Sequence, residues 1–506
     1  MRSKKVLKLL FVNVCLRPDG FTKVLPVGLA SVMTYFETKG YDFTLLDIDI
    51  NEYDDVYVEN YIKNNRFDII LTGTIVTHYK WIKWFVNMAK TQQPNSKIIV
   101  GNSVAGSIPE LFLEKTKGDI VVIGEGEITA YEAVEAIRLE KDLKNVQGIA
   151  FRDNQGSIIK NEPRKAANIE DFPYINWNHF DVKRYMAQPA PIPDKNISPK
   201  DMRIMPVITA RGCAFRCSFC HFVFWDDPYR NRKPKSILGE IKQLQEKYNT
   251  NYIDFWDDLS FASAIQVEKF CDAVIASGLK FKWLASVRVD LFSRGRLEGT
   301  NALRVAKKMK EAGCYTVGFA LESGNKEILK MMNKEIESEE FYTTVNTLRK
   351  AGIICQTSVV FGYPIETAET IKETFDQCLK ARMYPSIGFL LPLPYTVMYD
   401  YAKVRGFITD EDRYLESITE RQDICLNMTK MSDDEIMNEI KIGGAKLNKA
   451  LKIGLDKNSY IKTKGYKGHK IKRKAKSFDP ENTERIENDV SFNYAQTDFK
   501  FEEQVN

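Results

Sequence analysis

The stretch CAFRCSFC at residues 213–220 decides how the rest of the chain is interpreted. It places Cys213, Cys217 and Cys220 within eight residues, directly after an apolar, strand-like run and an Arg-Gly turn. Thiolates are soft ligands that suit iron–sulfur clusters, and three of them can hold a cubane while its fourth iron stays open to a small molecule. A zinc site would need a fourth ligand, which His221 could supply. Three unrelated buried cysteines are the remaining alternative, which the tight spacing disfavours.

The Cys-x3-Cys-x2-Cys spacing, with Phe219 before the last cysteine, resembles the radical S-adenosylmethionine (SAM) enzymes. The resemblance implies that Cys213, Cys217 and Cys220 hold a [4Fe-4S] cluster whose open iron binds the amino and carboxylate groups of SAM. It also implies reductive cleavage of SAM to a 5′-deoxyadenosyl radical. The reaction then needs an electron donor of the flavodoxin or ferredoxin type.

Residues 1–140 alternate apolar, strand-like runs with amphipathic helical segments. Continuous apolar strands separated by helices predict an α/β domain with a parallel, doubly wound (Rossmann-like) sheet. Strands are expected at residues 9–14, 43–47, 68–74, 97–101 and 119–124, and helices at 26–40, 79–90 and 127–137. Ligands on such sheets bind at the carboxyl ends of the strands.

This segment resembles the cobalamin-binding domain that precedes many radical SAM domains, through residues 25–30, 45–47 and 123–127. Glycine in these pieces permits the backbone to approach a flat corrin and its nucleotide tail closely. The resemblance, with the strand ends, implies a set of cobalamin-binding residues: Pro26, Gly28, Leu29, Asp47, Gly73, Thr74, Gly101, Asn102, Gly124, Glu125 and Gly126.

Two features depart from the cobalamin-binding pattern. The Asp-x-His-x-x-Gly loop of cobalamin-dependent mutases is missing, so no lower axial histidine comes from that place. Asn102 stands where the family often has a second glycine. His78 lies on the loop after the third strand and could contact the lower face of cobalt, but a helix-start residue bonded to backbone is the favoured interpretation.

Residues 141–204 are expected to connect two domains, with a β-hairpin at 148–160 and a proline-broken linker beyond it. The loop at 187–200 is placed near the mouth of the active site. From residue 205 to about 400 the chain repeats a strand-then-helix unit, which predicts a partial (β/α)6 barrel with its chemistry at the carboxyl ends of the strands. Barrel strands are expected at residues 205–210, 252–256, 281–287, 316–321, 353–361 and 387–391.

Polar residues follow the second and third predicted barrel strands. Asp257 and Asp258 could accept hydrogen bonds from the SAM ammonium or position the substrate; an acidic helix cap is the alternative. Ser286 and Arg288 end the next strand, and Arg288 could pair with the SAM carboxylate through two parallel hydrogen bonds.

Three further elements resemble radical SAM motifs near the later strands. GFALESG at residues 318–324 resembles Gly-x-Glu-Ser-Gly, which implies SAM contacts from Glu322, Ser323 and Gly324. Residues 361–367 and 392–396 resemble Gly-x-Pro-Gly-Glu-Thr and Pro-x-Pro-Gly-Thr, with Ile365 and Tyr395 in place of glycine. These departures concern loop shape near the substrate, and the resemblance covers roughly residues 5–410.

Composition sets the remaining expectations. A hydrophobic content of 44% and a charged content of 28% are ordinary for a soluble globular protein, and a net charge of +5 over 506 residues makes nucleic acid an unlikely partner. No run approaches a transmembrane helix in length. Nine cysteines without disulfide-framework spacing predict a reducing, cytoplasmic compartment. Residues 401–506 are expected to be helical at first, over about 410–437, and then a basic, solvated tail over 441–476 with no assigned partner.

Taken together, the motifs predict an enzyme resembling the class B radical SAM methyltransferases, with a [4Fe-4S] cluster, SAM and cobalamin as cofactors. A deoxyadenosyl radical would abstract hydrogen from an unactivated carbon of a small molecule, and methylcobalamin would supply the methyl group. No side chain is assigned as a catalytic acid or base. Cyclisation or rearrangement with the same cofactors is one alternative, and a non-catalytic protein that binds SAM and a cluster is another.

Overall fold

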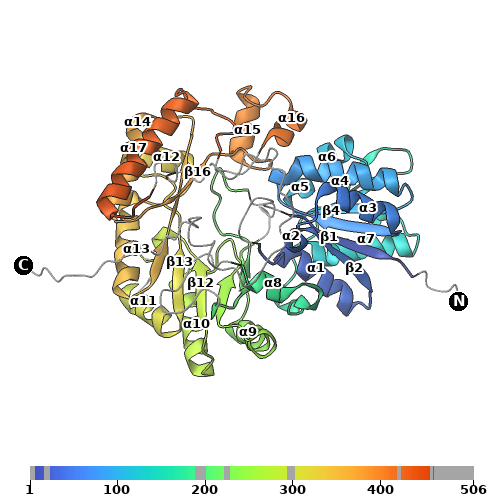
Figure 1. The fold of residues 1–506 in the computed structure, drawn as a ribbon, viewed down its shortest axis with the longest axis horizontal. Helices are drawn as coiled ribbons and strands as arrows, with labels where there is room; N and C mark the ends of the chain where they lie inside the picture. The colour runs from blue at the N-terminus through green and yellow to red at the C-terminus, as the bar shows by residue number, and fades with distance from the viewer. Residues whose placement is uncertain are drawn as a thin grey trace, which may run out of the picture.

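The computed structural model describes residues 6–15, 23–188, 201–221, 228–292, 302–418, 423–455 and 460. Figure 1 shows an amino-terminal sheet-and-helix domain in blue beside a larger barrel in green to orange. The carboxyl-terminal helices drawn in orange and red cover one side of the barrel and reach the first domain. Within the described ranges, no helix is long and apolar enough to span a membrane.

The first domain is built on one seven-stranded sheet with the order β2-β1-β3-β4-β5-β6-β7. Its parallel strands are β1 (Leu9–Asn13), β2 (Phe43–Asp47), β3 (Ile69–Gly73), β4 (Lys97–Gly101) and β5 (Ile120–Val122). The predicted hairpin consists of β6 (Ile149–Arg152) and β7 (Ile158–Lys160), and it extends this sheet because β6 pairs antiparallel with β5 and β7 with β6. The parallel sheet expected from the apolar runs is confirmed.

Helices lie on both sides of this sheet (Figure 1), because α1 packs on α7 while α3 packs on α4. The sequence pattern missed α3, in which only Val58 and Ile62 are buried, so its apolar periodicity is weak. The bounds are α1 (Val27–Thr38), α2 (Ile48–Asn51), α3 (Asp55–Asn64), α4 (Tyr79–Gln92), α5 (Ser103–Gly106), α6 (Pro109–Lys115), α7 (Gly126–Arg138) and α8 (Val182–Met186).

The second domain is a partial barrel of parallel strands. A five-stranded sheet has the order β14-β13-β12-β11-β8, and β15 pairs in parallel with β16. A bridge between Glu322 and Val359 joins the two sheets. The strands are β8 (Ile204–Val207), β11 (Tyr252–Phe255), β12 (Lys282–Ser286), β13 (Cys314–Gly318), β14 (Ile354–Gln356), β15 (Ser358–Phe361) and β16 (Ser386–Phe389). The predicted strand at 353–361 is thus divided in two.

Helices surround the barrel and a small apolar cluster fills one end of it. Tyr252, Leu284 and Tyr315 on adjacent strands pack with Met202, apart from the main core. They lie on the strand face opposite the helices and near the amino ends, so the carboxyl ends remain open for a site. The helices are α9 (Pro234–Tyr248), α10 (Ala264–Ser277), α11 (Ala302–Glu311), α12 (Lys326–Met331), α13 (Ser338–Lys350) and α14 (Ala368–Lys380).

The carboxyl-terminal segment corrects one expectation. Instead of one helix over 410–437, it forms α15 (Val397–Val404), α16 (Glu411–Ser417) and α17 (Asp433–Leu451), so residues expected in the basic tail are helical. α17 packs on α14, where a Cβ at Gly443 would collide with the ring of Phe375. Gly443 and Gly444 lie on the buried face of α17, so this face has fewer large apolar side chains than a typical packed helix. The rest of the tail, including residues 470–476, and most of the 187–200 loop lie outside the described residues.

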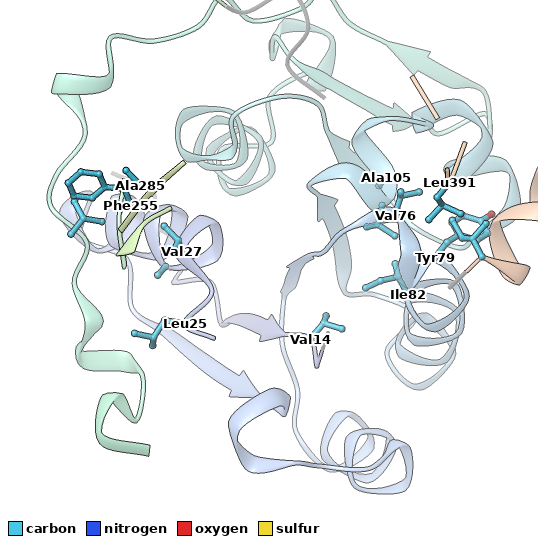
Figure 2. Packing of buried hydrophobic residues seen from close by; sticks show 14 of the residues in the cluster. Val14, Leu25, Val27, Val76, Tyr79, Ile82, Ala105, Phe255, Ala285 and Leu391 are labelled. Carbon is cyan, nitrogen blue, oxygen red and sulfur yellow. The ribbon is translucent and has the colours of Figure 1, made fainter. Parts of the chain in front are cut away.

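Figure 2 shows two places where the described parts of the two domains contact each other. On one side Val27 of α1 lies beside Phe255 and Ala285 of the barrel strands. On the other, Leu391 lies beside Tyr79 at the start of α4. Polar contacts reinforce the second place, where Asp412 of α16 accepts hydrogen bonds from Tyr79 Oη at 2.7 Å and Lys83 Nζ at 2.8 Å.

Candidate active site between the two domains

A cavity of about 630 Å³ lies between the strand ends of the first domain and the mouth of the barrel. Both domains therefore contribute to one space, as the positions of their strand ends predict. Expected site residues that line it are Gly28, Leu29, Gly73, Gly101, Asn102, Gly124, Glu125 and Gly126 from the first domain and Asp257, Asp258 and Ser286 from the barrel.

The part of the cavity inside the first domain is an apolar slot. The sheet supplies Leu71 and Ile99, and the helices supply Val32 and Ala130. A Cβ at Gly28 would meet no atom within 4 Å, so the backbone of α1 is open to a ligand there. Gly73 differs, because its Cβ would lie 2.9 Å from the carbonyl oxygen of Gly101. A slot with apolar walls and an accessible backbone fits the corrin periphery or nucleotide tail of cobalamin.

We expect a Gly28→Leu variant to fold normally and to bind cobalamin at least about tenfold more weakly, because a side chain there enters the slot. Gly28 is helical and has space around it, so removing glycine increases the free energy of unfolding by up to about 1 kcal/mol. Thermal melting without cofactor and a cobalamin titration separate the two effects. Unchanged cobalamin affinity would place the cofactor elsewhere.

Asn102, Ile365 and Tyr395 stand where the family often has glycine. Two of the three have a backbone conformation that is typical of glycine. Asn102 has φ +61° and ψ −172°, a region almost restricted to glycine, and its Oδ1 accepts a 2.6 Å hydrogen bond from Ser103 N. Tyr395 has φ +70° and is 50% exposed. Ile365 has no positive φ. At Asn102 and Tyr395 the backbone therefore has the positive φ that glycine adopts most easily, although neither residue is glycine.

Four residues expected to bind cobalamin lie outside this cavity. Pro26 precedes α1, and His78 precedes α4, with its Nδ1 3.3 Å from Thr77 Oγ1. Thr74 is buried, and its hydroxyl has no hydrogen-bond partner. Asp47 accepts hydrogen bonds from Asn13 Nδ2 at 2.8 Å and Tyr185 Oη at 3.0 Å, and burial raises its pKa. Asp47 thus holds strand ends together, and a cobalamin contact from any of the four stays a prediction.

Glu125 and Glu127, at the start of α7, are bound by arginines of the barrel domain. Arg211 reaches Glu127 at 2.5 Å and Glu125 at 3.2 Å, and Arg230 reaches Glu125 at 2.6 Å. Burial alone would raise the pKa of Glu127, but the charge of Arg211 and its hydrogen bond outweigh it and lower the pKa. Sequence reasoning missed both arginines, although two acidic residues in a buried loop signal a need for counter-charges.

The loop that carries the cysteine triad is held by backbone and side-chain hydrogen bonds. Ser218 donates to the carbonyls of Met332 and Met331, at 2.8 Å from its N and from its Oγ. Asn333 Nδ2 donates to the carbonyl of Arg216, also at 2.8 Å. The loop therefore rests on the turn that follows α12.

The donor set fits an iron–sulfur cluster. Cys217 is buried, Cys213 is half-buried and Cys220 is exposed. Among the described residues, no three Cys, His, Asp or Glu side chains are gathered around a point suited to one metal ion. A zinc ion needs its ligands within about 2.3 Å, whereas a cubane spreads its ligands over separate irons. His221 is the other candidate zinc ligand. Burial lowers the pKa of its imidazole to about 4, so the ring is neutral at pH 7.

A buried ion pair lies beside this loop. Lys334 Nζ is 3.0 Å from Glu322 Oε1, and Glu322 Oε2 is buried with no hydrogen-bond partner. Burial alone would lower the pKa of Lys334, but the charges of Glu322 and of Cys217 raise it. The unpartnered carboxylate oxygen fits the ammonium of SAM, and the lysine fits its carboxylate. Lys334 was not predicted, because nothing in its local sequence marks it.

Arg288 braces the cysteine loop. Its guanidinium carbon lies 3.6 Å from the ring centroid of Phe215, and its Nε donates to Asp290 at 3.1 Å. A further nitrogen donates to the carbonyls of Lys334 and Glu335. These contacts tie the loop to the turn that bears Lys334, and the expected pairing of Arg288 with the SAM carboxylate stays a prediction.

Three other residues expected near SAM, Ser323, Gly324 and Phe219, lie next to Glu322 in the sequence or close to Lys334. Gly324 N donates to Thr374 Oγ1 at 2.8 Å, and a Cβ at Gly324 would lie 2.6 Å from the carbonyl oxygen of Glu373, so only glycine fits against α14. Ser323 is buried and accepts from the backbone of Asn325. The ring of Phe219 lies 5.9 Å from Lys334 Nζ, close to the ion pair.

Three carboxylates line the barrel end of the cavity. Asp257 accepts hydrogen bonds from the backbone of Thr209 at 2.8 Å and of Ala210 at 3.0 Å, and burial raises its pKa to about 6. Burial also raises the pKa of Asp258 and, with the charge of Asp257, that of Asp254 to about 7. Sequence reasoning missed Asp254 because it lies within strand β11 rather than after it. Trp256, 45% exposed, completes this wall.

Comparison with family models finds two domains in this order. Residues 21–134 match the B12 binding domain, and residues 207–378 match the radical SAM superfamily. The two matches border the cavity and include, respectively, the glycine-lined slot and the cysteine triad.

Comparison with known proteins finds several relatives and a similar fold. The chain is 28% identical to an uncharacterised methyltransferase of Pyrococcus horikoshii, over 67% of this chain and 70% of the relative. It is 26% identical to an anaerobic magnesium-protoporphyrin IX monomethyl ester cyclase of Cereibacter sphaeroides, over 69% of this chain and 55% of the cyclase. The fold matches the radical SAM methyltransferase TsrM of Kitasatospora setae with a TM-score of 0.62 and 18% identity, over 80% of this chain and 77% of that one.

Proposed function

Since the chain is a cobalamin-dependent radical SAM enzyme with a [4Fe-4S] cluster, SAM and cobalamin as cofactors, we propose that it methylates an unactivated carbon of a small-molecule substrate. The observation that carries this proposal is the single cavity shared by the cobalamin slot and the open end of the barrel. A methyl donor and a radical source on either side of one space suit transfer to a carbon that has no acidic hydrogen.

When bound, the cluster and SAM supply a deoxyadenosyl radical and cobalamin supplies the methyl group. The chain's own part is to hold and orient these groups. Cys213, Cys217 and Cys220 supply the thiolates, and Glu322 with Lys334 would hold the amino-acid end of SAM beside them. With cobalamin bound, the apolar walls of the slot would help to keep water away from that side, which protects a radical from side reactions.

The named relatives support this choice without deciding it. The uncharacterised methyltransferase of Pyrococcus horikoshii and the structurally similar methyltransferase TsrM favour methyl transfer. The similarity to a cyclase favours oxidative cyclisation as the second candidate function, which would use the same cofactor sites. The two candidates differ in what happens to SAM, because only methyl transfer regenerates the methyl donor from a second SAM and releases S-adenosylhomocysteine.

The test is anaerobic and counts both products of SAM. Protein reconstituted with iron, sulfide and cobalamin is incubated with reductant, methyl-labelled SAM and a metabolite extract. We expect equal extract-dependent yields of 5′-deoxyadenosine and S-adenosylhomocysteine, together with labelled product detected by mass spectrometry. Extract-dependent deoxyadenosine without S-adenosylhomocysteine would contradict methylation and favour the cyclase-like candidate.

Two circumstances of the reaction are also proposals. An electron donor of the flavodoxin or ferredoxin type would reduce the cluster, since cleavage of SAM needs one low-potential electron. The protein would work in the cytoplasm. In support, no disulfide joins any of its nine cysteines, all of which lie in described residues.

A further inference from the structure

The stem of the cysteine loop is attached directly to the loop that lines the cobalamin slot. β9 (Ala210–Arg211) pairs antiparallel with β10 (Arg230–Asn231), and Arg211 lies directly opposite Arg230. Both arginines bind the same carboxylate, since Glu125 Oε1 is 3.2 Å from Arg211 Nη1 and 2.6 Å from Arg230 Nη2. The two-stranded ribbon of β9 and β10 therefore binds the Gly124–Glu127 loop from the barrel side.

The second acidic residue of that loop completes the attachment. Arg211 Nη2 is 2.5 Å from Glu127 Oε1, which also accepts a hydrogen bond from Ser31 of α1 at 2.5 Å. The side chains are largely buried, with exposed fractions of 16% for Arg211 and 5% for Glu127. Charge pairs screened from water hold their geometry firmly, because loss of one partner leaves the other buried and unpaired.

Only one residue separates this ribbon from the first cysteine. Gly212 follows Arg211, has φ +82° and packs so closely that a Cβ would lie 2.9 Å from the carbonyl oxygen of Pro228. Both Gly212 and the Gly124–Glu127 loop line the cavity. Displacement of one loop must therefore move the other, or break buried ion pairs.

We propose that Arg211 and Arg230 are positioning residues that couple the two cofactor sites, so that an assembled cluster tightens cobalamin binding and bound cobalamin stabilises the cluster. The two effects must be equal in free energy, because coupling between binding sites is reciprocal. The inference rests on the cofactors of the proposed function and is independent of methyl transfer itself.

The test measures the dissociation constant of hydroxocobalamin by absorbance titration, anaerobically, with and without the reconstituted cluster. For the wild-type chain we expect the cluster to tighten binding about tenfold, within the usual range of coupling between sites. In Arg211→Gln the ratio of the two constants should fall close to one. Because Arg211 lines the cavity, the ratio rather than the affinity carries the argument.

A second variant and a control make the test decisive. Arg230 is not among the residues that line the cavity, so Arg230→Gln should lower the ratio without removing a contact to cobalamin. Lys83→Gln removes ion pairs between the domains at a different place, to Asp412 and Glu416, and should keep the wild-type ratio. A wild-type ratio of one, or a ratio unchanged in both arginine variants, overturns the coupling.

Methyl transfer without coupling would overturn this inference alone, and coupling without methyl transfer would overturn the proposed function alone.

Discussion

Replacement of Cys217 by alanine is expected to remove the cluster and, with it, all cleavage of SAM. Cys217 is the buried member of the triad, and two thiolates do not hold a cubane. The loop should keep its position, because Ser218 anchors it to Met331 and Met332 without the cysteine side chain. Iron content, the cluster absorbance and 5′-deoxyadenosine formation with dithionite and SAM measure the loss, and cobalamin should bind as weakly as it does to wild-type protein without a cluster.

A Cys271→Ala variant is the matched control. Cys271 is fully buried in α10 and packs in the main core, away from the triad. Its truncation should lower the free energy of unfolding by about 1 kcal/mol and leave iron content and deoxyadenosine formation unchanged. Loss of iron in both variants would indicate general unfolding. Retention of a full cluster in Cys217→Ala would mean that the triad is not the cluster site.

Much of the fold could be predicted because its signals are local. Most parallel strands of both domains are largely apolar runs, and most end in or just before glycine or polar residues at the edge where a ligand binds. α17 escaped prediction because its contact with α14 depends on Gly443 fitting against Phe375, which no periodic pattern reveals. α3 escaped because most of its surface faces solvent.

Only those residues of the candidate site that belong to sequence motifs could be predicted. The triad, Glu322 and the slot glycines belong to recognisable stretches. Charged residues that act through pairing do not, because their partners lie far away in sequence. Lys334 pairs with Glu322 across helix α12, and Arg211 pairs with Glu127 across a domain boundary. Such pairs are fixed by how the barrel and the first domain pack.

Replacement of Lys334 by methionine is expected to destabilise the protein and to weaken SAM binding together. Lys334 and Glu322 are both buried, and Glu322 Oε2 already lacks a hydrogen bond. Without the lysine, the carboxylate is left without a counter-charge, which should lower the free energy of unfolding by about 3–5 kcal/mol. SAM affinity should fall at least about thirtyfold, the usual effect of truncating one partner of a buried charge pair. Urea unfolding and calorimetric titration with SAM measure the two effects.

The double variant Lys334→Met with Glu322→Gln separates the structural role of the pair from its role toward SAM. Removal of both charges should restore most of the stability, since a buried ion pair is often no more stable than a neutral replacement. It should not restore SAM binding, because both groups that would hold the amino-acid end of SAM are gone. Lys308→Met is the control, since its partner Asp272 is 60% exposed and an exposed ion pair contributes little to stability. A double variant that cleaves SAM at the wild-type rate would show that the pair serves the fold alone.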